Sequence, residues 1–330
     1  MAIPLQKIYG SDWHSMKKII RIGSRGSPLA LLQAKEVCAR IIAKNPSLSR
    51  EAEFEIVPIQ TSGDWTPGQK EISFRDAGSN KELFTKEIEQ ALLSDTIDMA
   101  VHSMKDVASR LPNELEIAAM LDRADPRDAL MLREAKSLAD LPQGAVFGTS
   151  SLRRQAQILA LRPDLKIVPL RGNIETRLRK LEEGKIDATM LAAASLVRLG
   201  MKEKATAIFE TDAMTPAAGQ GALGIEIKSG ANDIRALVSS VNAPETFTCV
   251  EAERAFLRKL DGSCHTPIGA FAWYSAPDMI RLEGLAAKPD GSYVLKLEAE
   301  GPAKEAEQLG ASLGETFRSK LTPSFWRSCE

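Results

Sequence analysis

The sequence has few of the residues that build metal centres and disulfide frameworks. Its 330 residues include four cysteines and three histidines, and no two cysteines have the Cys-x-x-Cys spacing of a zinc or dithiol site. The cysteines, Cys38, Cys249, Cys264 and Cys329, are scattered along the chain. We therefore expect no bound metal, and reduced thiols, which are the usual state in a cytoplasmic protein.

The chain also lacks long apolar runs and a strong charge of either sign. No stretch approaches the roughly 20 apolar residues of a membrane-spanning helix. Residues 1–18, interpreted as a loosely ordered extension, lack the apolar core and small-residue cleavage site of a secretory signal. The net charge of −1 gives no basic field that would attract nucleic acid or a membrane surface. These absences predict a cytoplasmic protein without a nucleic-acid or membrane partner.

The residues that are present alternate between strand and helix patterns. A strand at 19–22, a turn at Gly23-Ser-Arg-Gly-Ser27 and a helix that begins at Pro28 come first. The same plan returns as a strand at 145–147, the polar turn Gly148-Thr-Ser-Ser151 and a second helix. We therefore expect two α/β domains of similar design whose strand ends face one cleft.

After Pro244 the pattern changes to that of a small α+β domain. A helix at 245–260 is followed by strands at 268–273, 279–285 and 293–298, which predict a three-stranded antiparallel sheet before a closing helix. The predicted organisation is an extension at 1–18, one α/β domain at 19–121 with 222–240, a second α/β domain at 122–221, and the α+β domain at 241–330.

The stretch Asp98-Met-Ala-Val-His-Ser-Met-Lys-Asp106-Val carries the first chemical signal. Its apolar residues suit a buried strand, and polar and charged groups crowd the end of that strand. Because ligands of parallel sheets lie beyond the carboxyl ends of the strands, Asp106 is a candidate catalytic carboxylate. A solvated loop with a Lys105–Asp106 ion pair is the alternative that these residues leave open.

Arginines form the second signal. Arg153 and Arg154 open a predicted helix, where a cation opposes the helix dipole, directly after Thr149-Ser-Ser151. This placement is favourable if an anion binds between them. Pairing with local carboxylates is the alternative. The remaining candidates lie in comparable turns or nearby in sequence: Arg25, Arg171, Arg177 and Arg198.

The glycines of Gly219-Gln-Gly-Ala-Leu-Gly224 match the spacing of a dinucleotide-binding fingerprint. That fingerprint must follow a strand and open a helix, whereas here a strand pattern, Ile225-Glu-Ile, comes directly after the glycines. We therefore interpret the segment as a hinge or crossing between domains.

Cys264 is the cysteine most suited to chemistry, because it lies in a loop between Gly262 and Pro267. Cys38 and Cys249 lie in helix patterns and resemble small core residues. A nucleophilic pair of Cys264 with a histidine, His265 or His102, is a further alternative, although no orienting Asn or Asp is evident.

Seven motifs together resemble the porphobilinogen deaminase family, whose members are also called hydroxymethylbilane synthases. They occur in the family's order from about Ile19 to the end of the chain. The motifs are Arg21-Ile-Gly-Ser-Arg-Gly-Ser-Pro-Leu-Ala-Leu, Leu83-Phe-Thr-Lys-Glu-Ile, Val101-His-Ser-Met-Lys-Asp-Val, Gly148-Thr-Ser-Ser-Leu-Arg-Arg-Gln, Leu170-Arg-Gly-Asn-Ile, Gly219-Gln-Gly and Gly262-Ser-Cys-His-Thr-Pro-Ile.

The resemblance implies a transferase that couples porphobilinogen units head to tail on a covalently held dipyrromethane primer. Ammonia and the linear hydroxymethylbilane are released. It further implies a monomer with two periplasmic-binding-protein-like domains and an α+β domain, Cys264 as the thioether attachment point, and Asp106 as the catalytic carboxylate. The implied cofactor-binding residues are Ser103, Lys105, Thr149, Ser151, Arg153, Arg154 and Arg177, and the implied substrate-binding residues are Arg25, Ser27, Lys81, Arg171 and Arg198.

This chemistry agrees with the residues. Loss of ammonia from the substrate leaves a cation, which a fixed carboxylate stabilises, and a polycarboxylate ligand needs guanidinium partners. The sequence departs from the family at Ser79-Asn80-Lys81-Glu82, where Gly-Gly-Lys-Gly is usual, and at Ser263, where glycine is usual. Two alternatives are a carboxylate-binding module of the same two-domain fold without catalysis, and a deaminase-like protein with slow turnover.

Overall fold

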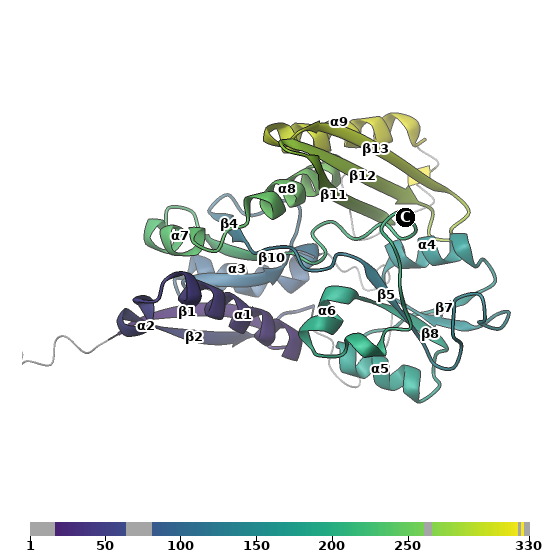
Figure 1. Ribbon diagram of the computed structural model, residues 1–330, viewed down its shortest axis with the longest axis horizontal. Helices are drawn as coiled ribbons and strands as arrows, with labels where there is room; N and C mark the ends of the chain where they lie inside the picture. Colours follow the sequence, from purple (N-terminus) through teal and green to yellow (C-terminus); the bar gives the residue numbers. More distant parts are fainter. Residues whose placement is uncertain (1–16, 64–80, 261–265, 323–324, 327–330) are drawn as a thin grey trace, which may run out of the picture.

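The computed structural model describes residues 17–63, 81–260, 266–322 and 325–326. These residues form three β-sheets, each with its own helices (Figure 1). Two of the sheets have five strands and mixed directions, and the third has three antiparallel strands. The predicted fold class, two α/β units and a C-terminal α+β unit, is confirmed.

The first sheet has the strand order β2-β1-β3-β10-β4. β1 runs parallel to β2 and β3, whereas β10 is antiparallel to β3 and β4. Helices α1, α3 and α7 pack on this sheet. The elements are β1 (Lys18–Arg25), α1 (Pro28–Lys44), α2 (Leu48–Glu51), β2 (Ala52–Ile59), α3 (Lys86–Leu93), β3 (Met99–Ser103), β4 (Leu115–Met120), β10 (Leu223–Lys228) and α7 (Asn232–Ser239).

Helix α1 begins where the sequence predicts. The Ser27 hydroxyl accepts a hydrogen bond from the backbone N–H of Ala30 at 3.3 Å, and Pro28 occupies the first turn. The buried residues Ala34, Val37 and Ile41 follow helical spacing and pack in the core of the first sheet. The start of the helix is therefore held at the end of β1.

The second sheet repeats this design in the order β7-β6-β8-β5-β9. β6 runs parallel to β7 and β8, and β5 is antiparallel to β8 and β9. The chain crosses between the two sheets twice, through residues 121–127 (the first crossing) and 209–222 (the second crossing). The elements are β5 (Asp128–Leu132), β6 (Val146–Gly148), α4 (Leu152–Leu161), β7 (Lys166–Val168), α5 (Ile174–Glu182), β8 (Ala188–Ala192), α6 (Ala193–Arg198) and β9 (Ala207–Ile208).

The glycine-rich segment 219–224 lies in the second crossing and at the start of β10. Gly221 has φ +90°, and a side chain there would collide with the carbonyl of Ala124 in the first crossing. The two crossings therefore touch at Gly221. This close contact and the positive φ account for a glycine at this position, so no bound nucleotide is needed to explain it.

The third sheet is formed by β11 (Ile268–Ala276), β12 (Met279–Ala287) and β13 (Val294–Pro302). Helices α8 (Pro244–Lys259) and α9 (Ala306–Lys320) pack on it (Figure 1). The buried rings of Phe256 and Phe317 meet edge to face at 5.0 Å between the centroids, in the core between helices and sheet. Short 3-10 helices complete the fold: η3 (Lys81–Phe84), η4 (Met104–Asp106), η5 (Lys202–Lys204) and η6 (Ala303–Glu305).

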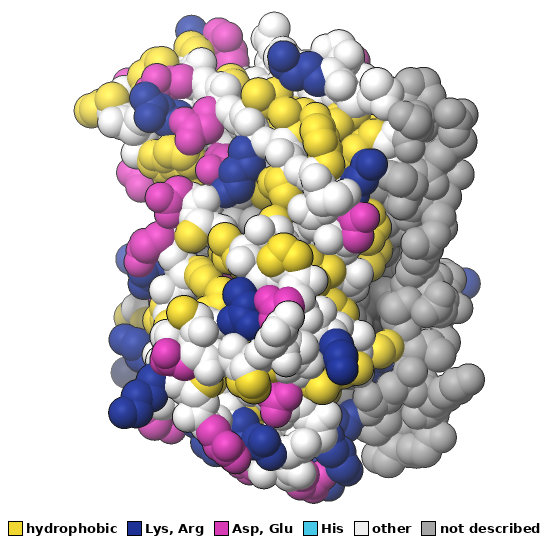
Figure 2. All heavy atoms as spheres, turned by 90° about the vertical axis from the view of Figure 1, so that its right-hand side faces the viewer, with side chains coloured by type: hydrophobic (Ala, Val, Ile, Leu, Met, Phe, Trp, Pro, Cys, Tyr) yellow, Lys and Arg dark blue, Asp and Glu magenta, His cyan; other side chains and the backbone are white. Residues whose placement is uncertain are grey.

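The surface carries charges of both signs. Figure 2 shows basic and acidic side chains interspersed among hydrophobic ones on the face that it presents. This mixture agrees with the net charge of −1. In the part of the chain that the structure describes, every helix is too short or too polar to cross a membrane.

Candidate active site

A cavity of about 870 Å³ is lined by residues of all three structural units. The first sheet contributes the end of β1, the start of α1 and the β3–η4 turn, and the second contributes the starts of α4 and α5. Leu257, Thr266 and Ile268 come from the third unit. The predicted cleft at the strand ends of two α/β units is therefore present.

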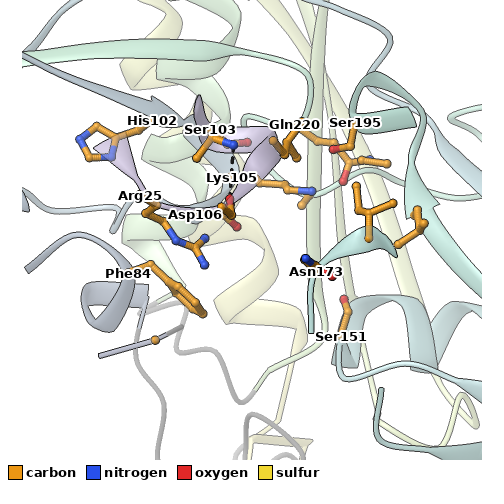
Figure 3. A pocket seen from close by; sticks show the side chains of 18 of the residues that line it. Arg25, Phe84, His102, Ser103, Lys105, Asp106, Ser151, Asn173, Ser195 and Gln220 are labelled. Atoms are coloured by element: carbon orange, nitrogen blue, oxygen red, sulfur yellow. Dashed lines mark hydrogen bonds between the residues drawn. The ribbon is translucent and has the colours of Figure 1, made fainter. Parts of the chain in front are cut away.

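Asp106 lies in η4, directly after β3, and lines this cavity. Met104, which is 1% exposed, anchors η4 in the core. Gly219 allows this packing, because a side chain there would come within 2.8 Å of Met104 Cβ. Figure 3 shows Asp106 between Arg25 of the first sheet and Lys105. The fold thus places the predicted carboxylate on the wall of the cavity.

Lys105 is half-buried beside Asp106 and also lines the cavity. Burial among protein atoms lowers the pKa of its ammonium to about 8, although the charge of Asp106 opposes this shift. The charges of Arg153 and Arg154 lower the pKa further. Lys105 is therefore a cation on one sheet that faces a cationic region of the other.

Arg153 and Arg154 line the cavity but share a protein carboxylate, Asp128, at the start of β5. Arg153 Nη1 lies 2.7 Å from Asp128 Oδ2, and Arg154 Nη2 lies 2.7 Å from Asp128 Oδ1. Burial alone would raise the pKa of the Asp128 carboxyl, but the two guanidinium charges outweigh it and hold that pKa below its usual range. In this structure the two arginines therefore meet the alternative left open by the sequence, a protein carboxylate, although Asp128 lies more than 20 residues before them in the chain.

Arg171 and Arg177 reach the cavity from the turn before α5 and from α5 itself. Gly172 has φ +102° in this turn, and its carbonyl accepts a 2.9 Å hydrogen bond from Arg177 Nε. Asn173 caps α5 by accepting from the N–H of Thr176 at 2.9 Å. Burial lowers the pKa of Arg177 to about 10, so this arginine stays charged at neutral pH.

Arg25 lies at the end of β1, with its guanidinium carbon 4.6 Å from the ring centroid of Phe84 (Figure 3). The ring therefore supports the guanidinium beside the cavity. Phe84 was missed as a site residue, although it lies in the Leu83-Phe motif. Other polar lining residues that were missed include Gln33, Asn173, Ser195 and Gln220.

The remaining predicted site residues are placed as follows. Ser27, Ser103 and Ser151 line the cavity. Thr149 lies behind it, where its hydroxyl accepts from the N–H of Ser151 at 3.1 Å. Arg198 is not among the lining residues, because its Nε lies 3.0 Å from Glu36 Oε2 and joins α6 to α1.

Two predicted residues are not described in full. Cys264 and the departure Ser263 lie outside the described residues, and so do Ser79 and Asn80. Lys81 belongs to η3, but its side chain lies outside the described part.

The wall of the cavity is cationic. Within the described ranges it has two carboxylates, Asp106 and Glu175, against six cationic side chains: Arg25, Lys105, Arg153, Arg154, Arg171 and Arg177. Guanidinium groups bind carboxylates in a fork-like geometry, so this donor set suits a ligand with several carboxylates. No group of three or more metal-ligating side chains occurs among the residues that the structure describes.

Two family models match most of the chain. Residues 20–236 match the model described as "Porphobilinogen deaminase, dipyromethane cofactor binding domain", and residues 247–319 match that of the C-terminal domain of the same family. The chain belongs to the porphobilinogen deaminase family. The resemblance seen in the seven motifs is therefore confirmed.

Curated members of the porphobilinogen deaminase family are similar to the chain over nearly its whole length. The porphobilinogen deaminase of Nitrobacter winogradskyi is 48% identical over 305 residues, which are 92% of this chain and 94% of that protein. That of Alkaliphilus metalliredigens is 45% identical over 92% of this chain and 93% of its own length. The chloroplastic porphobilinogen deaminase of rice, Oryza sativa subsp. japonica, is 45% identical over 94% and 87%.

Solved structures give a weaker similarity. A periplasmic substrate-binding protein from Coxiella burnetii matches 69% of this chain and 94% of its own, with a TM-score of 0.41 and 14% identity. A periplasmic binding protein from Salmonella typhimurium has a TM-score of 0.37, with 11% identity over 68% of this chain and 92% of that one. We base the fold on the strand order instead. All six cationic residues of the cavity lie in the segment matched by the family's cofactor-domain model.

Proposed function

We propose that this chain is a transferase of tetrapyrrole biosynthesis. It joins porphobilinogen units head to tail on a dipyrromethane cofactor and releases ammonia and the linear tetrapyrrole hydroxymethylbilane. The observation that carries the proposal is the cationic cavity with Asp106 on its wall, within residues 20–236. Porphobilinogen and its oligomers carry an acetate and a propionate group on each ring, which is the ligand chemistry that this wall suits.

The cofactor is assigned to Cys264 through a thioether, as the sequence resemblance implies. Thr266, two residues further along the chain, lines the cavity, which supports an attachment point beside it. The residues assigned to the cofactor are Ser103, Lys105, Thr149, Ser151, Arg153, Arg154 and Arg177. Thr149 does not line the cavity, so its part is to hold the turn that contains Ser151. The cofactor supplies the acceptor ring on which the growing chain is built.

The incoming substrate is assigned to residues on both sheets: Arg25, Ser27, Lys81, Arg171 and Arg198. Arg25 and Ser27 support this assignment, because they line the cavity from the end of β1 and the start of α1, whereas α4 belongs to the second sheet. Arg198 needs a rearrangement before it can bind substrate, since Glu36 holds it in this structure. A substrate carboxylate would have to replace Glu36 at that guanidinium.

Asp106 is assigned the catalytic role. Ammonia leaves the aminomethyl group of the substrate with the bonding electrons, so positive charge develops on the organic fragment. A carboxylate fixed on the cavity wall stabilises that charge, and its position on η4 is set by the buried Met104. The acetate and propionate groups of cofactor and substrate are paired with Lys105 and the arginines, so the carboxylate that faces the developing cation is that of Asp106.

The domain boundaries given in the sequence analysis are part of this proposal, as are a cytoplasmic location and a monomeric state. The three sheets and two crossings support the division at 121–122, 221–222 and 240–241. Size-exclusion chromatography with light scattering measures the oligomeric state directly.

Intact-mass spectrometry of the purified protein tests the proposed function. We expect a mass above that of the sequence by one dipyrromethane, and digestion should place the adduct on the peptide that contains Cys264. Incubation with porphobilinogen should release ammonia and a linear tetrapyrrole. An unmodified Cys264 in active protein would contradict the attachment, and tight binding without turnover would favour the binding-module alternative.

A further inference from the structure

Asp128 is a buried carboxylate that the proposed mechanism does not use. It is the first residue of β5, directly after the first crossing, and its side chain is 0% exposed. It does not line the cavity, so a ligand there does not touch it. Its contacts are all made with residues that either line the cavity or belong to the crossings.

Both guanidinium groups are paired with this single carboxylate. Arg154 donates to Asp128 Oδ1 from both Nε (3.1 Å) and Nη2 (2.7 Å), and Arg153 Nη1 lies 2.7 Å from Oδ2. Arg154 Nη1 donates to the carbonyl of Met190 at 2.9 Å, and Arg153 Nη1 donates to that of Thr215 at 2.7 Å. Because a guanidinium is rigid and planar, these contacts determine which of its N–H groups are left for the cavity.

Asp128 is itself held by the second crossing. Gln220, which is 1% exposed, donates from Nε2 to Asp128 Oδ1 at 3.1 Å and to the carbonyl of Pro126 at 2.6 Å. Pro126 belongs to the first crossing, so one amide group ties both crossings to the carboxylate. The orientation of the two arginines is therefore linked to the segments that connect the two α/β units.

We propose that Asp128 is a positioning residue that orients Arg153 and Arg154 toward the carboxylates of the ligand in the cavity. The proposal rests on the proposed function. Two roles for Asp128 make opposite predictions. If Asp128 only neutralises the charge of the arginines, it weakens ligand binding, and its removal should strengthen binding. If Asp128 orients the guanidinium groups, it strengthens ligand binding, and its removal or displacement should weaken binding.

The test uses three variants of the full chain. Asp128→Asn removes the charge, and Asp128→Glu keeps the charge but moves the carboxylate by one methylene group. Asp125→Asn is the matched control, because Asp125 is a carboxylate of the first crossing that pairs with Arg127, away from Arg153 and Arg154. The measurements are the intact mass of each purified protein, its thermal midpoint, and kcat and KM for porphobilinogen.

We expect both Asp128 variants to carry the primer in a smaller fraction of molecules. We also expect the KM of the loaded fraction to rise by up to about a hundredfold, the order of loss that a misplacement of about one ångström can cause. Asp125→Asn should behave like the unaltered protein in both respects. If Asp128→Asn fails to fold because two buried cations lose their partner, Asp128→Glu still decides the question, since it retains the charge.

The proposal would be overturned by Asp128→Glu with unaltered loading and KM, by Asp128→Asn with a lower KM, or by Asp125→Asn with the same defects as the Asp128 variants. A loss of thermal stability with unchanged KM in the folded fraction would also overturn it, because that is the signature of a merely structural role. Failure of the proposed function is distinguishable, since then the unaltered protein would carry no adduct and turn over no substrate.

Discussion

At the residue scale, the cations of the cavity wall differ in how firmly they hold their charge. Burial lowers the pKa of Arg177 to about 10 and that of Lys105 to about 8. Arg177 is therefore fully charged at neutral pH, whereas Lys105 begins to lose its proton just above neutrality. Ligand binding should depend on pH through Lys105 more than through the arginines.

We expect kcat/KM for porphobilinogen to fall above pH 8, because this parameter reports ionisations of the free enzyme and neutral Lys105 no longer attracts a carboxylate. About one pH unit below the pKa of Lys105 the ammonium is almost fully protonated and its contribution is nearly complete. Lys105→Arg should remove this fall, since an arginine stays charged throughout the range. Identical pH profiles for Lys105→Arg and the unaltered protein would assign the fall to another group.

Asp106→Asn should keep the fold and the primer but lose most of the turnover. The amide has nearly the shape of the carboxylate but cannot balance the positive charge that develops as ammonia leaves. Removing one well-placed electrostatic partner typically lowers kcat by about 10²–10³. Steady-state kinetics on protein shown by mass to be primer-loaded measure this, and a kcat close to normal would disprove the catalytic role.

The arginines should divide the ligand between them, because they line the cavity from different sheets. We expect Arg153→Leu and Arg154→Leu to impair primer loading, whereas Arg25→Leu keeps the primer but stalls the addition of monomers. Intact-mass spectra after incubation with porphobilinogen separate the two, since each added ring gives a discrete step. Arg179→Leu on the exposed side of α5 is the control. Normal loading and elongation in all three variants would mean that these arginines hold no ligand.

At the scale of elements, helix α8 is the part of the C-terminal unit on which the rest packs. It packs against α9 and against β11 and β12, and Phe256 contributes a fully buried ring to this contact. Gly284 in β12 allows the approach, because a side chain there would come within 2.7 Å of that ring. The segment that contains Cys264 follows α8 directly, so the packing of this helix determines where that segment begins.

Phe256→Ala should destabilise the C-terminal unit by about 3–5 kcal/mol, the usual cost of deleting a fully buried aromatic ring and leaving a cavity. The edge-to-face contact with Phe317 is lost as well. Urea denaturation followed by circular dichroism measures the change. Val197→Ala is the control, because this side chain is 52% exposed. It should change the free energy of unfolding by less than about 0.5 kcal/mol, as is usual for substitutions at the surface.

At the scale of the whole molecule, one buried carboxylate joins both crossings to the third sheet. Glu253 of α8 is 0% exposed. It pairs with Arg123 of the first crossing at 2.5 Å and accepts from the N–H of Gly219 in the second crossing at 2.6 Å. It also accepts from the N–H of Ala272 in β11 at 2.8 Å. The relative placement of the three units therefore depends strongly on this side chain.

Glu253→Gln should lower stability by about 3–5 kcal/mol, because it leaves Arg123 without a counter-charge in a buried site. The amide also presents N–H groups to partners that can only donate. We expect a lower thermal midpoint and separate unfolding transitions for the C-terminal unit and the α/β units by calorimetry. Glu307→Gln, in an exposed pair with Arg258, is the control. A single transition at the normal midpoint would show that other contacts hold the units together.

Several helix starts, the strands of the C-terminal sheet and the family could be predicted from the sequence, whereas β4, β5, β9 and α7 were not. Ser27, Ser151 and Asn173 cap their helices, and each cap depends on residues only three positions away. The strands of the C-terminal sheet were likewise predicted within a few residues of their bounds. These features are local, so a pattern of neighbours was sufficient. The stretch that ends at Asp106 was predicted on the same basis.

The strand order and the partners of the charged residues could be read only from the folded structure. β10 lies between β3 and β4 although more than 100 residues separate them, and Arg198 pairs with Glu36 across 162 residues. Asp128 is 26 residues from Arg154, and nothing in the spacing distinguishes it from other acidic residues. Which carboxylate meets which guanidinium depends on how the sheets are placed. That placement follows from burial of apolar surface over the whole chain, and not from any short segment.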